Sequence, residues 1–229
     1  MPGGWLMWQL DQHEVDYEVV SADDYTELGA EYDTILMPDG ISRQRIVDGL
    51  DPDRVPERFH WARGVGEEGW AALAAFVQEG GTLVALGSAS ETARQLLSLP
   101  VQRVQPPAPF RVPGSLIRVQ THEGVPETWG MPESWTTWFD NDAAFRLLDG
   151  DGQAATTYPD DGDPLLGSGY AAGADALRGL ADVVTFDVGE GHVVIAGTDL
   201  NFRTWPRVAW TLVANAIYHG PSEPVTLED

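Results

Sequence analysis

Residues 76–87, with the sequence FVQEGGTLVALG, contain the end of a helix, a turn and a buried strand. Apolar residues recur every three or four positions over 67–78, which is the pattern of one helix face. Gly80 and Gly81 end this helix, because glycine readily adopts the left-handed conformation that follows many helices. The apolar run at 82–86 is typical of a strand covered on both faces, as in a parallel sheet.

The same alternation of strands and helices extends to both sides of this stretch. We expect further strands at four places, which are 15–20, 34–37, 183–188 and 192–196. The sequence Gly189-Glu190-Gly191 between the last two strands indicates a hairpin. Three further helices are expected: one at the N-terminus, one from the turn at 87–90 to about residue 97, and one over 204–219. This order predicts an α/β fold built on a doubly wound sheet.

Residues 101–180 differ in character from the rest of the chain. Four prolines between 104 and 114 forbid a regular element there, and the later part alternates aromatic residues with acidic, glycine-rich turns. We therefore expect a β-rich insertion at 101–180 within one domain of 1–229. The polar end, 221–229, is expected to be a flexible tail.

The charge balance is strongly acidic, with 36 aspartates and glutamates against 13 basic residues and a formal net charge of −23. Such a surface repels nucleic acid and anionic membranes, so neither is an expected partner. All the basic residues are arginine, which fits a salt-adapted source or a GC-rich genome equally well. Nothing at the N-terminus has the character of a signal peptide, and a soluble protein is expected. The sequence does not assign a cellular compartment, although secretion is expected if the chain is part of a larger peptidase.

The ordered set of short motifs resembles the class I glutamine-amidotransferase-like domain that follows the catalytic domain in certain M14 zinc carboxypeptidases. The residues that carry the resemblance are Gly4-Trp5, Trp8, 35–39, 66–69, 76–87, 112–116, Tyr158-Pro159, 189–194 and Asn201-Phe202-Arg203. It implies a flavodoxin-like fold and a role beside a peptidase, with a zinc carboxypeptidase domain or a second copy as partner. The peptidase domain itself is absent. The family also has one more strand before the first helix, so a fragment or a misplaced start is expected.

The turn after residues 82–86 is where active relatives of this fold carry their nucleophile. Here it reads Gly87-Ser88-Ala89-Ser90, and the chain has no cysteine. A serine nucleophile needs a histidine base, but residues 197–200, where that histidine is expected, contain none. Ser88 and Glu91 have the spacing of a capping box, which is the favoured interpretation of this turn. A serine hydrolase that uses Ser88 is the alternative.

Polar residues also follow the predicted parallel strands at their carboxyl ends, where open α/β sheets bind ligands. The candidates for such a ligand crevice are Asp39, Gly40, Ser88, Ser90 and Asp199. The plain alternative is that they are ordinary turn residues.

The histidines and tryptophans offer less specific signals. The five histidines are far apart in the sequence, so we expect no metal site, and no cofactor is expected either. Trp129, Trp135 and Trp138 lie in the insertion. Exposed, they would form a surface for a partner domain or a sugar, and buried they would belong to the core.

These observations favour a non-catalytic accessory or interaction domain that resembles the C-terminal domain of M14 metallocarboxypeptidases. Two other hypotheses stay open, a serine hydrolase using Ser88 and a module that binds a small ligand or a carbohydrate.

Overall fold

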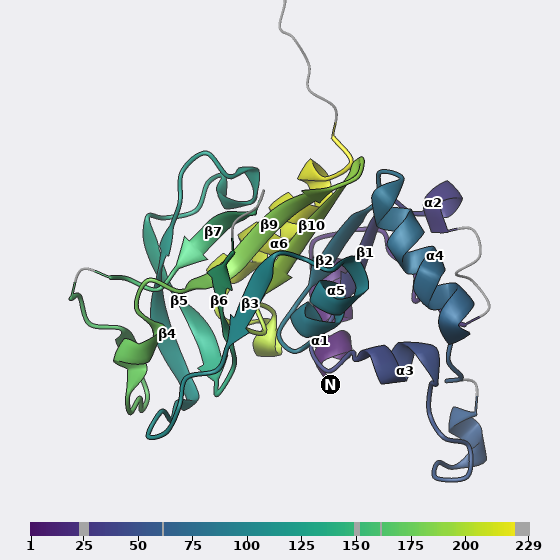
Figure 1. Cartoon of the computed structure of the whole chain (residues 1–229), viewed down its shortest axis with the longest axis horizontal. Coiled ribbons are helices and arrows are strands. Elements are labelled where there is room, and N and C mark those ends of the chain that lie inside the picture. Colours follow the sequence, from purple (N-terminus) through teal and green to yellow (C-terminus); the bar gives the residue numbers. More distant parts are fainter. Residues whose placement is uncertain (23–27, 61, 149–151, 161, 223–229) are drawn as a thin grey trace, which may run out of the picture.

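The computed structural model describes residues 1–22, 28–60, 62–148, 152–160 and 162–222, and is built on one curled mixed sheet with helices on both sides (Figure 1). The strands are β1 Thr34–Met37, β2 Thr82–Ala85, β3 Val101–Val104, β4 Pro113–Thr121, β5 Ser134–Asp140, β6 Ala144–Leu147, β7 Gln153–Thr157, β8 Leu166–Ser168, β9 Ala181–Val188 and β10 Gly191–Ala196. The α-helices are α1 Pro2–Gln12, α2 Leu28–Glu31, α3 Arg43–Val47, α4 Gly66–Gln78, α5 Ala89–Leu97 and α6 Val208–His219. The short 3-10 helices are η2 Glu57–Phe59, η3 Pro126–Thr128, η4 Ala174–Leu177 and η5 Phe202–Thr204.

The sheet has a parallel part and an antiparallel part. Its main order is β1-β2-β10-β9-β7-β4-β5, with β3, β6 and β8 paired off this path. β2 lies between β1 and β10 and is parallel to both, whereas β9 and the strands beyond it pair antiparallel. Within the described residues, the parallel part of the sheet consists of β1, β2 and β10.

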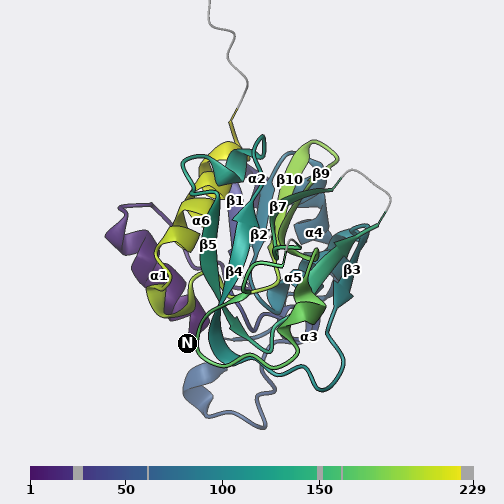
Figure 2. The ribbon, with the colours of Figure 1, turned by 90° about the vertical axis from the view of Figure 1, so that its left-hand side faces the viewer.

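Alternate residues of β2 and β10 point to two separate cores, as the two-residue period of a strand requires. Val84 and Val194 pack with α1 and α6, whereas Leu83 and Val193 pack with α4 and α5. All four side chains are at most 1% exposed. Figure 2 shows α1 and α6 on one side of the sheet and α4 and α5 on the other.

The antiparallel strands of residues 101–180 continue the same sheet. β7 pairs with β9, and β4 then pairs with β7, β5 and β8. Phe139 and Tyr158 from this region are 0% and 1% exposed, in the same core as α1 and α6. The predicted β-rich segment therefore shares its core with the α/β part.

Several expected elements are present where the sequence placed them. The helix expected at 67–78 is α4, and the apolar run at 82–86 contains β2. β9 and β10 form the expected hairpin.

Two expectations about elements are wrong. Residues 15–20 form no strand, and Val19 is 65% exposed, so the alternation there reflects no buried face. The last helix begins at Val208 instead of residue 204, because Arg203 and Thr204 have φ angles of 48° and 60°, which no α-helix accommodates.

No helix in the described part of the chain is both long and apolar enough to cross a membrane. Of the predicted flexible tail, residues 223–229 lie outside the described residues.

Candidate functional site

Asp39 and Ser88 meet at the carboxyl ends of β1 and β2. The Ser88 amide and hydroxyl both donate to Asp39 Oδ1, at 2.8 and 2.6 Å. The Gly40 amide in turn donates to Ser88 Oγ at 2.9 Å. The two strands are parallel neighbours, so the turns that follow them lie side by side. Three of the five crevice residues predicted from the sequence are therefore in direct contact.

Gly87 allows this close approach. Its φ angle is +58°, and a Cβ atom there would lie 2.7 Å from Asp39 Oδ1. Any side chain would combine an unfavourable backbone conformation with a steric clash. The Gly87 amide also donates to the Thr198 carbonyl at 3.0 Å, which joins this turn to the one after β10.

Asp199, in the turn after β10, is close enough to Asp39 for their charges to interact. Its side chain is largely buried, and Asp199 Oδ1 accepts a hydrogen bond from the Asn201 amide at 3.3 Å. Burial, followed by the charge of Asp39, raises the pKa of Asp199 to about 6.

A third carboxyl group, that of Asp142, comes from the loop between β5 and β6. Burial raises the pKa of Asp142 to about 7, and the charges of Asp182, Asp39 and Asp140 add to this increase. Near neutral pH, carboxyl groups in this region can carry protons and donate as well as accept hydrogen bonds. Sequence analysis did not identify Asp142, because it lies in a loop of the insertion with no motif around it.

Asp182, at the start of β9, is fully buried and accepts a hydrogen bond from Thr198, which lies in the turn after β10. Tyr158 donates its phenolic hydrogen to Asp182 Oδ1 at 3.2 Å, and the Thr198 hydroxyl donates to the same oxygen at 3.0 Å. The Thr137 hydroxyl lies 2.8 Å from the Thr198 hydroxyl. Burial raises the pKa of Asp182 to about 6, although these hydrogen bonds favour the charged form.

The capping box expected from Ser88 and Glu91 does not form. Ser88 has helical backbone angles of −67° and −21°, and its side chain makes no cap hydrogen bond to α5. An N-cap residue needs extended angles to direct its oxygen at the helix amides. Ser88 bonds to Asp39 instead, and Glu91 accepts hydrogen bonds from Arg94 and Gln95.

Ser90 does not belong to the crevice. It is fully buried, and its hydroxyl donates to the Gly87 carbonyl. This corrects the inclusion of Ser90 among the ligand candidates, because an inward-facing residue of the first turn of α5 cannot reach a ligand.

The amides after Ser88 are also occupied. The Ala89 amide donates to the Leu86 carbonyl at 3.1 Å and the Ser90 amide to the Gly87 carbonyl at 3.2 Å. In hydrolases with this kind of turn, the amide after the nucleophile helps to bind the oxyanion.

The histidines of the chain have their contacts elsewhere. His13 stacks on Trp210, and His60 lies against backbone carbonyls of its own loop. His122 lies 2.9 Å from the Thr157 hydroxyl. His192 and His219 lie together at the amino end of β10, with ring centroids 5.4 Å apart. Sequence spacing gave no sign of this last pair.

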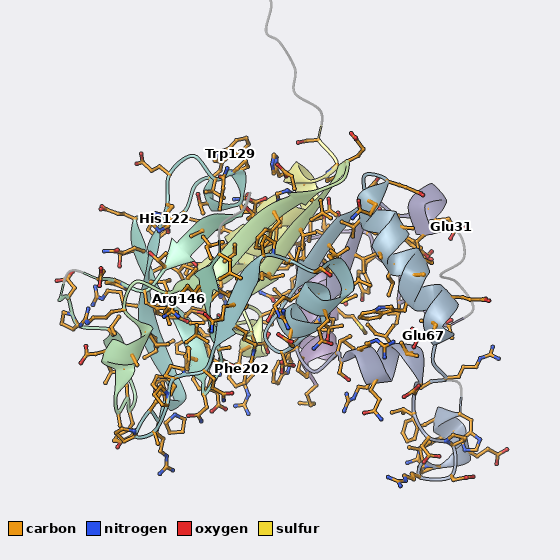
Figure 3. All side chains as sticks on the ribbon, in the orientation of Figure 1. Glu31, Glu67, His122, Trp129, Arg146 and Phe202 are labelled. Carbon is orange, nitrogen blue, oxygen red and sulfur yellow. The ribbon has the colours of Figure 1, made fainter. Side chains whose placement is uncertain are left out.

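The tryptophans proposed as a partner surface do not share one. Trp135 is only 6% exposed and belongs to the core, so its place among the surface candidates is wrong. Trp138 stacks on Phe202 with ring centroids 4.3 Å apart. Trp129 is 67% exposed and lies at the top of the view in Figure 3, well above Phe202.

Comparisons with known proteins support the fold. No protein-family model and no curated protein matches this sequence. A cytoplasmic protein of Salmonella typhimurium matches with a TM-score of 0.60 at 17% identity, over 94% of this chain and 85% of its own. A Thermoplasma acidophilum protein described as a GMP synthase subunit gives 0.54 at 12% identity, over 92% and 84%. A protein of Bacteroides uniformis described as ThuA-like gives 0.51 at 13% identity, over 92% and 79%.

At these identities the likeness concerns the fold alone. The chain has a mixed α/β fold similar to that of ThuA-like proteins and of the GMP synthase subunit, which is the class I glutamine-amidotransferase-like fold. That part of the resemblance seen in the sequence is confirmed. Its M14 carboxypeptidase part stays a prediction.

Proposed function

We propose that this chain is a non-catalytic accessory or interaction module with a flavodoxin-like, doubly wound arrangement of its parallel strands. One observation carries the proposal, namely that the Ser88 hydroxyl donates to a carboxylate, Asp39, and not to an imidazole. A serine nucleophile in this position needs a histidine to remove its proton.

The surroundings of Ser88 support the same conclusion. The Ala89 amide, which would bind an oxyanion in an active relative, donates to Leu86. Among the described residues, the hydrogen-bond partners of the Ser88 amide and hydroxyl are Asp39 and Gly40, and neither is a histidine. Both observations support a turn without the base and the free oxyanion donor that acyl transfer requires.

A serine-reactive fluorophosphonate probe tests this proposal. We expect no covalent labelling of the folded protein, and the Ser88→Ala variant should give the same result. Labelling of the parent that disappears in Ser88→Ala would establish the serine hydrolase alternative and overturn the proposal.

The partner we propose is a zinc carboxypeptidase domain of the M14 family, on the strength of the motif resemblance. Size-exclusion chromatography of the chain mixed with such a domain from the same genome is the direct test. Co-elution at equal stoichiometry is the expected result. Elution as two separate species would contradict this choice of partner but would leave the non-catalytic assignment of Ser88 standing.

A second candidate function is the binding of a small hydroxyl- or amine-bearing ligand in the crevice. Its support is the group of carboxyl groups near Asp39, where Asp142 and Asp199 have raised pKa values. Thermal shift measurements with monosaccharides and diamines test this function. A shift that Asp199→Asn removes would support it, and no shift with either class would contradict it.

A further inference from the structure

A second cluster of chemically active side chains lies at the opposite end of the parallel strands from Ser88. It contains Glu127 of η3, His192 of β10 and His219 at the end of α6, and one ligand atom from each lies within 4.8 Å of the others. The cluster is next to Trp129, which Figure 3 labels. Glu127 and His219 are 92 positions apart in the sequence, so only the fold brings them together.

Glu127 is the most informative member of the cluster. It is 0% exposed, and its Oε1 atom lies 2.7 Å from His192 Nε2. Its other oxygen, Oε2, has no hydrogen-bond partner among the described residues. A buried carboxylate with an unsatisfied oxygen is costly unless a positive charge compensates it.

The fold holds Glu127 in this position through its backbone. The Asn215 side-chain amide donates to the Glu127 carbonyl at 2.9 Å and to the Trp129 carbonyl at 2.8 Å. Asn215 belongs to α6, as does His219, so η3 and the end of α6 are tied together. The buried carboxylate is therefore positioned in advance of any ligand.

His192 lies between two carboxylates. Its Nδ1 atom is 3.0 Å from Asp187 Oδ1, while Nε2 faces Glu127. Histidines that bind metals usually donate from the second ring nitrogen to a carboxylate, which orients the ring and fixes its tautomer. With the proton on Nδ1, the lone pair of Nε2 points toward Glu127. A cation about 2 Å from both atoms would satisfy both groups once Nε2 and Oε1 move apart from their present 2.7 Å.

His219 completes the set from the side. Its ring packs edge-on against His192, in the last turn of α6, where the helix carbonyls favour a positive charge. A surface pocket of about 290 Å³ adjoins the cluster and is lined by Asp187, Glu190, His192 and His219, among others. The cluster is thus accessible to an ion from solution.

We propose that Glu127, His192 and His219 bind one divalent transition-metal ion, with Zn²⁺ the best match, and that Asp187 orients His192. Two imidazole nitrogens and one carboxylate oxygen suit Zn²⁺, whereas Ca²⁺ and Mg²⁺ prefer ligand sets made of oxygen alone. Three protein ligands leave a fourth coordination position for water or for a ligand in the pocket. The ion would join η3, which belongs to the insertion, to β10 and α6.

The test uses untagged full-length protein, dialysed against a chelator and then into chelator-free buffer. Isothermal titration with Zn²⁺ should give one ion per chain, and Zn²⁺ should raise the melting temperature. We expect Glu127→Gln and His219→Ala to weaken Zn²⁺ binding by at least about 100-fold, since each removes a direct ligand. Asp187→Asn should weaken it by about 10- to 100-fold, as for other residues that orient a metal-bound histidine.

His122→Ala is the matched control, because His122 directly follows β4 of the same sheet and lies outside the cluster, against Thr157. It should bind Zn²⁺ as the parent does. Circular dichroism checks that each variant folds. If a variant does not fold, the visible spectrum of the parent protein loaded with Co²⁺ still reports the geometry of the metal ligands. Absence of stoichiometric Zn²⁺ binding, or equal binding by parent, Glu127→Gln and His219→Ala, would overturn the proposal. The cluster would then be a histidine held by hydrogen bonds to two carboxyl groups.

Discussion

The hydroxyl of Ser88 donates to Asp39 Oδ1 at 2.6 Å across 49 positions of sequence, and the Ser88 amide donates to the same oxygen at 2.8 Å. One carboxylate oxygen therefore fixes both the backbone and the side chain of the turn after β2. The Gly40 amide also donates to Ser88 Oγ, so these hydrogen bonds hold the turn after β1 against the turn after β2.

Asp39→Ala should therefore destabilise the fold, because two donors of Ser88 lose their acceptor. We expect a loss of about 1–3 kcal/mol in the free energy of unfolding, measured with urea. Combined with Ser88→Ala, the double variant should show a coupling of at least about 0.5 kcal/mol. The exposed Asp16 supplies a control, Asp16→Ala, with little expected effect. Additive losses in the double variant would contradict the linkage.

Gly87→Ala should disturb the same turn from its backbone. The new Cβ would lie 2.7 Å from Asp39 Oδ1, at a φ angle of +58°. We expect a loss of at least about 1 kcal/mol, from the strained backbone and the displaced carboxylate. Gly4→Ala is the matched control, since nothing lies within 4 Å of a Cβ there and alanine favours helix α1. Equal stability of the two variants would refute this account of Gly87.

Stability should fall between pH 5 and pH 8 because of the buried carboxyl groups. The folded-state pKa is raised to about 6 for Asp182 and about 7 for Asp142. A raised pKa means that the folded protein binds the proton more tightly than the unfolded chain does. The stabilisation is complete below the unfolded pKa and is lost as the pH rises through 6 to 7. Above pH 5 the folded protein holds these two protons over about three pH units in total, so urea unfolding at pH 5 and at pH 8 should differ by about 4 kcal/mol.

Asp142→Asn isolates one part of that pH dependence. Asparagine keeps an acceptor for the Asp140 amide, which bonds to Asp142 Oδ2 at 2.8 Å, but does not titrate. The variant should therefore lose less stability than the parent between pH 5 and pH 8. Groups common to both proteins cancel in this comparison. An unchanged slope would exclude Asp142 as a source.

The net charge of −23 predicts a dependence on salt. Repulsion among exposed carboxylates is screened by ions, so KCl should raise the melting temperature. Calorimetry at low and molar KCl measures this directly. A melting temperature independent of KCl would favour the other explanation of the composition, an arginine-rich codon bias without salt adaptation.

The sequence was a good guide where burial produces a continuous pattern. The apolar run at 82–86 and the helix before it needed no tertiary information, because both faces of β2 are covered. The strand predicted at 15–20 is absent because an alternating pattern shows only that a segment is able to form a strand. Whether a neighbouring strand pairs with it depends on distant parts of the chain.

The candidate sites were only partly predictable for the same reason. Asp39 and Ser88 could be paired in advance, since parallel neighbours end at one edge of a sheet. Asp182 was not identified because it lies inside a strand whose apolar neighbours dominate the pattern. Glu127 and His192 belong to segments whose proximity depends on how the insertion returns to the sheet.

The hydroxyl groups around Asp182 bear on how this protein can be shortened. Tyr158 comes from residues 101–180, whereas Thr198 comes from the turn after β10, and both donate to one buried carboxyl group. A truncated chain without 101–180 would lose β7, the neighbour of β9, together with one of these donors. The insertion is therefore not a detachable module: its boundaries are unsuitable for domain swaps or a minimal expression fragment, and the two parts should melt in a single cooperative transition.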